Sequence, residues 1–397
     1  MAKVLISLLG TGTSAKGDTN RNRYETTDYA VDGKIYESEL FVAGASAKHY
    51  AIDKLFLIGT SGSMWDEVAA FFNADNETLA LLDKKANNKL IQDDISQLNR
   101  YIDKELGISG SKCLFVPDGE NDSEVWQTFE VLRSLIDTFT TDDELYFDIT
   151  HGFRSQSLLM FVIAQFGQTY KNYKIGGILY GKLIKNELSP IIDLKMYYEF
   201  LEWSKAIKNL RNYGNGNDLK KLLENSNEDK TIKKTIADFA NALSIADMDS
   251  MQKSMRRLKS SMELLRGSKS LIIKDILSNE LLDFVRQFNS DGTRSEFLFE
   301  LADWYKKCSN FAMAYIALAE AAMSRVIEKN NLSADKNGHE LAKEKILKLG
   351  EIANAFKEVN EIRNDIAHQL VSSAHAVSKC IDDFDDHYKI LKKIYEV

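Results

Sequence analysis

The chain has 397 residues and a mass of 45.0 kDa, enough for two or three domains. Two prolines favour long helices over an all-β fold, and three cysteines without a C-x-x-C pair exclude a disulfide scaffold or a zinc ribbon. The net charge is −8, with 20 Lys and Arg against 29 Asp and Glu in residues 1–200 and 31 against 30 in the rest. Neither half is basic enough to hold long nucleic acid by phosphate neutralisation, so any bound anion needs a few local donors.

No apolar run approaches the roughly 20 residues that span a bilayer, and the start of the chain is too short for a secretory signal. Because the cysteines are few and unpaired in sequence, we expect a reducing setting. The sequence therefore predicts a cytoplasmic protein without a membrane partner.

The first half of the chain alternates short apolar runs with amphipathic stretches. Strands are predicted at 4–9, 55–58, 113–116, 145–149 and 175–180, with helices at 64–72, 90–106, 124–139 and 153–170. An Asp-Gly pair at 32–33 between alternating residues predicts a β-hairpin. This pattern indicates α/β architecture, a Rossmann-like, mostly parallel sheet domain over residues 1–195.

The second half carries helical spacing of Leu, Ile, Phe and Met and no strand pattern. Helices are predicted at 196–212, 230–245, 248–266, 271–289, 294–308, 311–329, 340–367 and 374–395. We therefore expect an all-α domain over residues 196–397.

Three segments rich in Gly, Ser and Thr follow predicted parallel strands, where open sheets bind ligands. They contain Gly10, Thr11, Gly12 and Thr13; Thr60, Ser61, Gly62, Ser63, Met64 and Trp65; and Thr150, His151, Gly152, Arg154 and Ser155. Backbone amides, hydroxyls and the guanidinium of Arg154 can bind phosphate, and Trp65 could stack on a base. Together they predict a nucleotide or polyphosphate pocket. The alternative is that each segment is only a tight, N-capping turn.

Two other phosphate-binding patterns do not hold. Residues 10–15 fit G-x-G-x-x-[G/A], but a polar loop follows where a dinucleotide-binding fold opens a helix, which argues against a nicotinamide-dependent dehydrogenase. Residues 176–182 imitate a P-loop, but Leu183 replaces the magnesium-binding hydroxyl and the segment reads as a strand.

The helical half contains one catalytic candidate set: Arg363, Asn364 and His368. A helix places Asn364 and His368 on one face beside Arg363. An imidazole can move protons near pH 7 and a guanidinium can hold a phosphate, which suits metal-free RNA cleavage driven by the 2′-hydroxyl. The alternative is an exposed helix end whose cations pair with acidic neighbours such as Asp365. For His375 and His387 on the last helix we expect a solvated acidic face rather than a metal site.

The stretches 57–66, 148–155 (D-I-T-H-G-F-R-S) and 363–368 occur in this order, and the set resembles the CRISPR-associated CARF–HEPN ribonucleases of type III systems, in the branch with a D-x-T-H-G motif. The resemblance covers nearly the whole chain in domain order and size. It implies a CARF domain that dimerises and binds one cyclic oligoadenylate as an allosteric activator, with cyclic tetra-adenylate favoured and cyclic hexa-adenylate as the open alternative. It also implies a HEPN domain in which two copies of Arg363, Asn364 and His368 form one metal-independent site that cleaves single-stranded RNA.

Two further readings stay open. Some CARF domains slowly degrade their own messenger, and nothing in this sequence decides whether this one does. The chain could also be a nucleotide-responsive regulator or scaffold that cuts nothing. We expect no DNA partner, because the densest basic run, at 256–259, has too few basic residues for a recognition helix.

Overall fold

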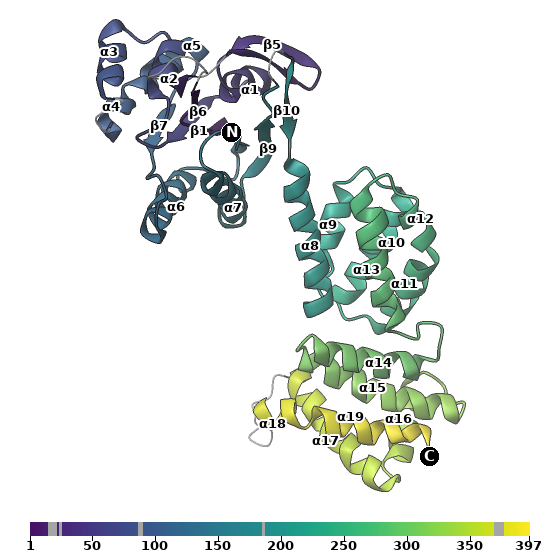
Figure 1. Cartoon of the computed structure of the whole chain (residues 1–397). Coiled ribbons are helices and arrows are strands. Elements are labelled where there is room, and N and C mark those ends of the chain that lie inside the picture. Colours follow the sequence, from purple (N-terminus) through teal and green to yellow (C-terminus); the bar gives the residue numbers. More distant parts are fainter. Residues whose placement is uncertain (15–21, 24–25, 86–89, 185–186, 369–376) are drawn as a thin grey trace. The chain divides into compact units, whose positions relative to one another are not determined.

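The computed structural model describes residues 1–14, 22–23, 26–85, 90–184, 187–368 and 377–397. Near the gaps only the backbone is described, for residues 13–14, 22–23, 84–85, 367–368 and 377–378. The chain forms two compact units, Met1–Glu199 and Phe200–Val397 (Figure 1).

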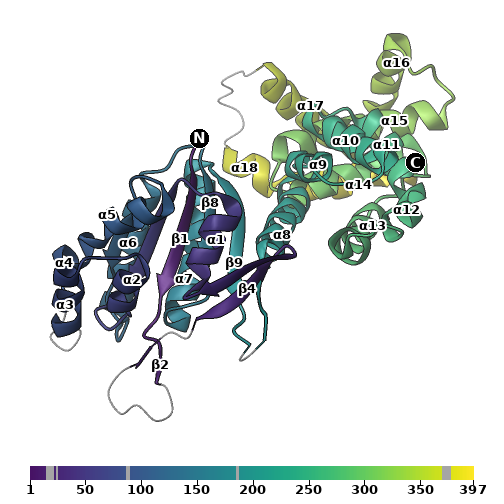
Figure 2. The same cartoon turned by 90° about the horizontal axis from the view of Figure 1, so that it is seen from above.

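The first unit is built on an eight-stranded sheet of order β5-β4-β10-β9-β8-β1-β6-β7. Its parallel centre consists of β1 (Lys3–Leu9), β6 (Lys54–Gly59), β7 (Lys112–Phe115), β8 (Glu144–Asp148) and β9 (Lys174–Gly181). At one edge, β10 (Ser189–Asp193) runs antiparallel to β9 and beside it lies the hairpin of β4 (Thr27–Val31) and β5 (Lys34–Glu39). A separate pair, β2 (Thr13–Ser14) and β3 (Asn22–Arg23), follows β1 (Figure 2).

Helices cover both faces of this sheet, which is why its central strands are mostly apolar, with Ser7 and Asp148 as buried polar exceptions. One face packs against α6 (Asp122–Ile136) and α7 (Arg154–Lys171) (Figure 1). The other face packs against α1 (Val42–Tyr50), α2 (Trp65–Phe71), α3 (Asn76–Lys85), α4 (Gln92–Ser96) and α5 (Leu98–Leu106). Alternate residues of β1 divide accordingly: Val4 and Ile6 belong to the α6–α7 core, and Leu5 and Leu9 to the other core.

The second unit is entirely helical among its described residues and shares one apolar core. Its first helices are α8 (Lys195–Tyr213), α9 (Asn217–Glu224), α10 (Lys230–Ser244), α11 (Met248–Ser260), α12 (Met262–Arg266), η1 (Ile272–Leu277, a π-helix) and α13 (Ser278–Arg286). Then follow α14 (Arg294–Lys307), α15 (Phe311–Lys329), α16 (Lys336–Ile346), α17 (Gly350–His368), α18 (Val377–Asp382), α19 (Phe384–Lys392) and the 3-10 turn η2 (Lys393–Tyr395). Figure 1 shows α14 and α15 side by side.

The predicted fold class is confirmed: a mostly parallel, Rossmann-like sheet domain precedes a helical region. The five predicted strands and the hairpin are present, and 174–181 is a strand rather than a P-loop. The sequence missed β10, α1, α3 and α9, and it joined helices that break at Gln97 and at residues 347–349. Within the described ranges, no helix combines the length and apolarity needed to cross a membrane.

Candidate functional site

The first two loops predicted from the sequence meet at the carboxyl edge of the sheet. Strands β8, β1 and β6 are neighbours and run parallel, so the loops that follow them emerge side by side. The Ser63 hydroxyl donates to the Leu9 carbonyl at 2.8 Å, and the Met64 amide donates to the Gly10 carbonyl at 3.1 Å. These bonds join the loop after β1 to the loop after β6.

The loop after β6 is shaped by its own buried residues. The Thr60 amide donates to the Ser63 hydroxyl at 2.9 Å, and the Trp65 indole donates to the Thr60 carbonyl at 2.9 Å. Trp65 is 0% exposed, so its ring has no face open for stacking on a base. Of the six residues predicted here, Ser61 and Gly62 are accessible, whereas the others hold the loop in place.

The loop after β8 is organised by the buried carboxylate of Asp148. This group accepts from the Ser7 hydroxyl at 2.6 Å and from the amide and hydroxyl of Thr150 at 3.0 and 2.6 Å. Thr150 in turn accepts from the Gly181 amide at 2.7 Å, which ties the loop to β9. Burial lowers the pKa of His151, and the attraction of Asp148 for an imidazolium opposes that shift, so His151 is neutral at pH 7.

Gly152 turns the chain from β8 into α7. Its φ of +86° and the lack of space around it both require glycine, because a Cβ would lie 2.9 Å from Oε1 of Gln156 and 3.2 Å from Cβ of Leu8. The following helix begins with exposed Arg154 and Ser155 and has no acidic residue in its first turn. A helix start of this kind favours an anion.

The structure describes only part of the predicted loop after β1. Gly10, Thr11 and Gly12 lie at the sheet edge, half-buried, and a Cβ on Gly62 would lie 3.8 Å from the methyl group of Thr11. Thr13 begins β2, but its side chain lies outside the described residues.

The second candidate set lies near the end of α17. Arg363 donates to Oδ1 of Asn364 at 3.4 Å, and its Nη2 lies 3.6 Å from Oε1 of Glu320 on α15. The other oxygen of Glu320 lies 3.8 Å from Nε2 of His339 on α16. Arg363 therefore pairs with Glu320 rather than with Asp365. His368 is the last residue of α17, and its side chain lies outside the described residues.

Glu320 and His339 were not found by sequence reasoning. They come from α15 and α16, 43 and 24 positions before Arg363, and neither forms a motif with it. The only sequence signal is that Glu320 is an acidic residue in an otherwise apolar stretch of α15.

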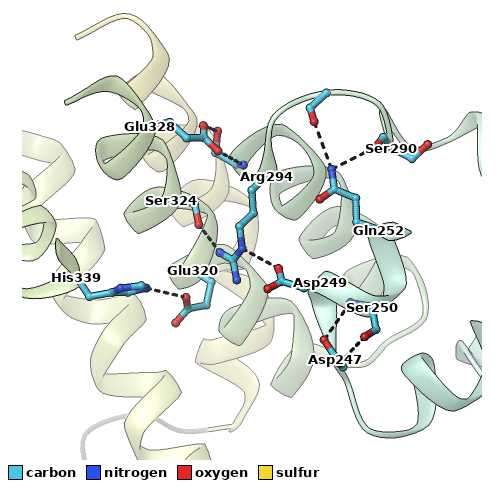
Figure 3. A network of polar contacts seen from close by, with 12 residues as sticks. Asp247, Asp249, Ser250, Gln252, Ser290, Arg294, Glu320, Ser324, Glu328 and His339 are labelled. Atoms are coloured by element: carbon cyan, nitrogen blue, oxygen red, sulfur yellow. Dashed lines mark hydrogen bonds and ion pairs between the residues drawn. The ribbon is translucent and has the colours of Figure 1, made fainter. Parts of the chain in front are cut away.

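The helix that carries Glu320 is anchored by a polar network (Figure 3). Arg294, the first residue of α14, donates to Asp249 on α11 at 2.9 Å and to Ser324 on α15 at 2.5 Å. Ser324 lies one turn after Glu320 on the same helix. Glu328, a further turn along, accepts from the amide of Ser295 at 2.8 Å. The network fixes α15, and with it Glu320, against α11 and α14.

The prediction of a solvated acidic face was wrong for His387. This residue is buried, its Nε2 lies 2.9 Å from Glu358 on α17, and its Nδ1 lies 3.3 Å from the Tyr315 hydroxyl. It therefore joins α19 to α15 and α17. His375 lies outside the described residues.

Comparison with known proteins identifies the N-terminal domain. Residues 4–183 match the family model of the CARF domain of the CRISPR system endoribonuclease Csx1, and residues 199–294 match that of the second domain of CRISPR-associated protein MJ1674. Residues 4–183 are therefore a CARF domain. The predicted resemblance is confirmed for the CARF domain, whose carboxyl sheet edge carries the loops described above.

Two similar proteins extend this comparison. CRISPR-associated protein MJ1674 of Methanocaldococcus jannaschii is 29% identical over 427 aligned positions, which cover 99% of this chain and 66% of that protein. The CARF-containing chain thus spans just under two thirds of that relative's length. Csm6 of Enterococcus italicus, solved with cyclic hexa-2′-fluoro-hexa-dAMP, aligns over 99% of this chain and 93% of its own, with 12% identity and a TM-score of 0.44.

Proposed function

We propose that this protein is a cytoplasmic type III CRISPR effector whose CARF domain binds a cyclic oligoadenylate and thereby activates RNA cleavage. The sensor would comprise residues 1–195, and a helical linker with a HEPN domain would comprise residues 196–397. The observation that carries the proposal is the convergence of three donor-rich loops at one sheet edge of a CARF domain.

The ligand class follows from the donors at that edge. Ser61 and Ser155 are accessible hydroxyl residues, Arg154 adds a guanidinium, and α7 begins at Arg154 without an acidic residue in its first turn. Such donors bind several phosphates without a basic domain, which fits the acidic charge of this half. We favour cyclic tetra-adenylate, with cyclic hexa-adenylate as the competing ring size.

The chemistry assigned to α17 is an attack of the RNA 2′-hydroxyl on the adjacent phosphorus. His368 takes the 2′-hydroxyl proton or gives a proton to the leaving 5′-oxygen, and Arg363 stabilises the charge on the phosphate oxygens. Asn364 orients the reacting groups. The products are a 2′,3′-cyclic phosphate and a 5′-hydroxyl, and no metal ion takes part.

Dimerisation is supported by an exposed apolar stripe on α7. The stripe consists of Leu158, Val162, Phe166 and Tyr170, which are 67%, 48%, 45% and 64% exposed and recur every four residues. Apolar residues gathered on one helix face mark an interaction surface. A second copy covering this stripe would bring two ligand-binding edges to one two-fold axis.

The direct test is to titrate cyclic tri-, tetra- and hexa-adenylate against a fluorescence-quenched RNA reporter with EDTA present. We expect one ring to raise the cleavage rate at least about a hundredfold and His368→Ala or Arg363→Ala to abolish it. Arg286→Ala is the matched control, because Arg286 is exposed and pairs with Asp283 on its own helix. Mass spectrometry of the products checks for the cyclic phosphate.

Three outcomes would contradict parts of the proposal. If no ring changes the cleavage rate or the melting temperature, the proposed sensor role is refuted. Binding without cleavage would favour a regulator or scaffold. Full cleavage by His368→Ala would remove the catalytic assignment. Chromatography of the ligand after incubation with His368→Ala protein shows in the same experiment whether the CARF domain degrades its activator.

A further inference from the structure

A hollow of about 720 Å³ lies beside the loop after β6, between that loop and α6. Its walls include Ser61, Phe115, Asp118, Trp126, Gln127 and Glu130. Ser61 belongs to both the phosphate-binding edge and the hollow, so a ligand whose phosphate sits at the loop can extend directly into it.

The hollow offers aromatic surface of the size of a nucleobase. The ring of Phe115 stands at 89° to the buried ring of Trp65, with centroids 5.8 Å apart. This contact holds the Phe115 ring in position. Trp126 on α6 is 64% exposed, and its ring contact, to Phe129, is edge-on at 5.6 Å. An indole that is mostly exposed to solvent is available for stacking on a planar ligand.

The charge of the walls favours a nucleobase over a phosphate group as the occupant of the hollow. Asp118 and Glu130 are acidic, Gln127 and Ser61 are neutral hydrogen-bonding groups, and the lining contains no lysine or arginine. Glu130 already pairs with Arg133 on α6 at 3.0 Å. Within the described chain Asp118 makes no ion pair, so its carboxylate is the better acceptor for an amino group.

Asp118 also borders the phosphate-binding edge. It precedes Gly119, where a Cβ would lie 3.9 Å from the Ser155 hydroxyl at the start of α7. The segment that follows Asp118 therefore lies next to the start of α7, while the hollow itself includes Ser61 of the loop after β6.

We propose that this hollow binds one adenine base of the cyclic oligoadenylate, with Trp126 stacked on the ring and Asp118 accepting from the exocyclic amine. This inference rests on the proposed sensor function and adds the determinant of base identity. Trp126 thus takes the stacking role that the sequence predicted for Trp65.

The test measures the affinity of cyclic tetra- and hexa-adenylate by isothermal titration calorimetry for the full chain and its variants. Trp126→Ala should weaken binding of the preferred ring about tenfold or more, and Trp126→Phe should recover most of the loss. The matched control is Tyr213→Ala on α8, because Tyr213 is also 64% exposed and should leave the affinity unchanged.

The role of Asp118 is tested with a cyclic oligo-inosinate, which carries a carbonyl oxygen where adenine carries the amine. The wild-type protein should prefer the adenylate ring about tenfold or more. Asp118→Asn should reduce or invert that preference, because an amide can donate to the inosine carbonyl as well as accept from the amine.

The outcomes separate this inference from the proposed function. If the wild type binds no ring, both fail. If it binds a ring and Trp126→Ala binds it equally well, the base-binding hollow is overturned while the sensor stands. The inference also fails if Trp126→Ala loses affinity only by dissociating into monomers in sedimentation velocity, because the indole would then act through the dimer.

Discussion

Ser7 and Asp148 are polar residues inside otherwise apolar strands, and they organise the edge of the CARF domain where we propose that the ligand binds. Both are buried, and they are hydrogen-bonded to each other between β1 and β8. A buried carboxylate is stable only when its oxygens accept hydrogen bonds, and Asp148 accepts three. The loop conformation after β8 is therefore fixed before any ligand arrives, which lowers the entropic cost of binding.

Gly152→Ala should both destabilise the protein and weaken ligand binding. The new methyl group would meet Gln156 and Leu8 in a backbone with φ of +86°, so we expect a loss of about 2 kcal/mol or more in unfolding free energy. Relieving the clash must shift the loop after β8, and the affinity for cyclic oligoadenylate should fall about tenfold or more. Urea unfolding and calorimetry measure the two effects.

The chain provides a close control for this variant in Gly110. It has the same φ of +86°, but a Cβ there would make only ordinary contact, 3.5 Å from Lys54. Gly110→Ala should cost about 1 kcal/mol from the backbone alone and leave the affinity unchanged. Equal effects of the two variants on binding would refute the positioning role of Gly152.

Glu320→Gln should impair RNA cleavage with little effect on stability. The carboxylate lies near both Arg363 and His339, and all three side chains are partly exposed, so removing its charge should change stability by about 1 kcal/mol or less. Arg363 would lose the partner that orients it, and kcat should fall about tenfold while KM changes little. Stopped-flow cleavage assays and thermal melts measure this.

Glu344→Gln on α16 is the control for the same chemical change at an exposed position. If Glu320→Gln instead raises the cleavage rate, Glu320 restrains Arg363 rather than positioning it for the reaction.

Sequence reasoning located the residues of the sheet edge better than it assigned their roles. The Gly, Ser and Thr clusters follow the strands as predicted, because strand-to-helix turns need those residues. Exposure could not be predicted, since Trp65 is buried by Phe115, a residue 50 positions away on β7. Trp126 lies on a helix without a motif, and only the fold brings it beside Ser61.

At the scale of elements, the strands were predictable because both faces of the central sheet are buried and each central strand is a mostly apolar run. Helix α1 was missed because its sequence, V-A-G-A-S-A-K-H-Y, is made of small residues that give little helical periodicity. Strand β10 was missed because it contains Pro190 and pairs at the boundary between the parallel centre and the hairpin. Neither element could be recognised from its own sequence, because its formation depends on what packs against it.

The stripe on α7 predicts how the protein responds to a charge at one helix face. Leu158→Glu should shift the oligomeric state toward monomers, because a carboxylate buried in an apolar interface lacks a partner. Ligand affinity should fall with it if one ring is shared by two copies. Sedimentation velocity over a concentration series measures the dissociation constant of the dimer.

The matched control is Leu271→Glu, which places the same charge at a leucine that is 70% exposed, compared with 67% for Leu158. It should leave the oligomeric state unchanged. A Leu158→Glu protein that remains dimeric at micromolar concentration would place the interface elsewhere.

At the scale of the whole molecule, the proposed reaction needs more than one set of catalytic residues. Cleavage by a 2′-hydroxyl requires a base for the incoming oxygen and an acid for the leaving oxygen. The candidate set on α17 supplies one imidazole, that of His368. Two copies supply both functions, which is why the dimer rather than the single chain is the proposed catalytic unit.

A mixed dimer separates a shared site from two independent sites. Wild-type and His368→Ala chains carrying different affinity tags are co-expressed, and the heterodimer is isolated over two columns. In the mixed dimer a shared site lacks either its acid or its base. The activated cleavage rate should therefore fall to within about tenfold of the rate of the His368→Ala homodimer. Independent sites would leave about half of the wild-type rate. A heterodimer of wild-type and Arg286→Ala chains should keep the full rate, which shows that tagging and purification do not impair the enzyme.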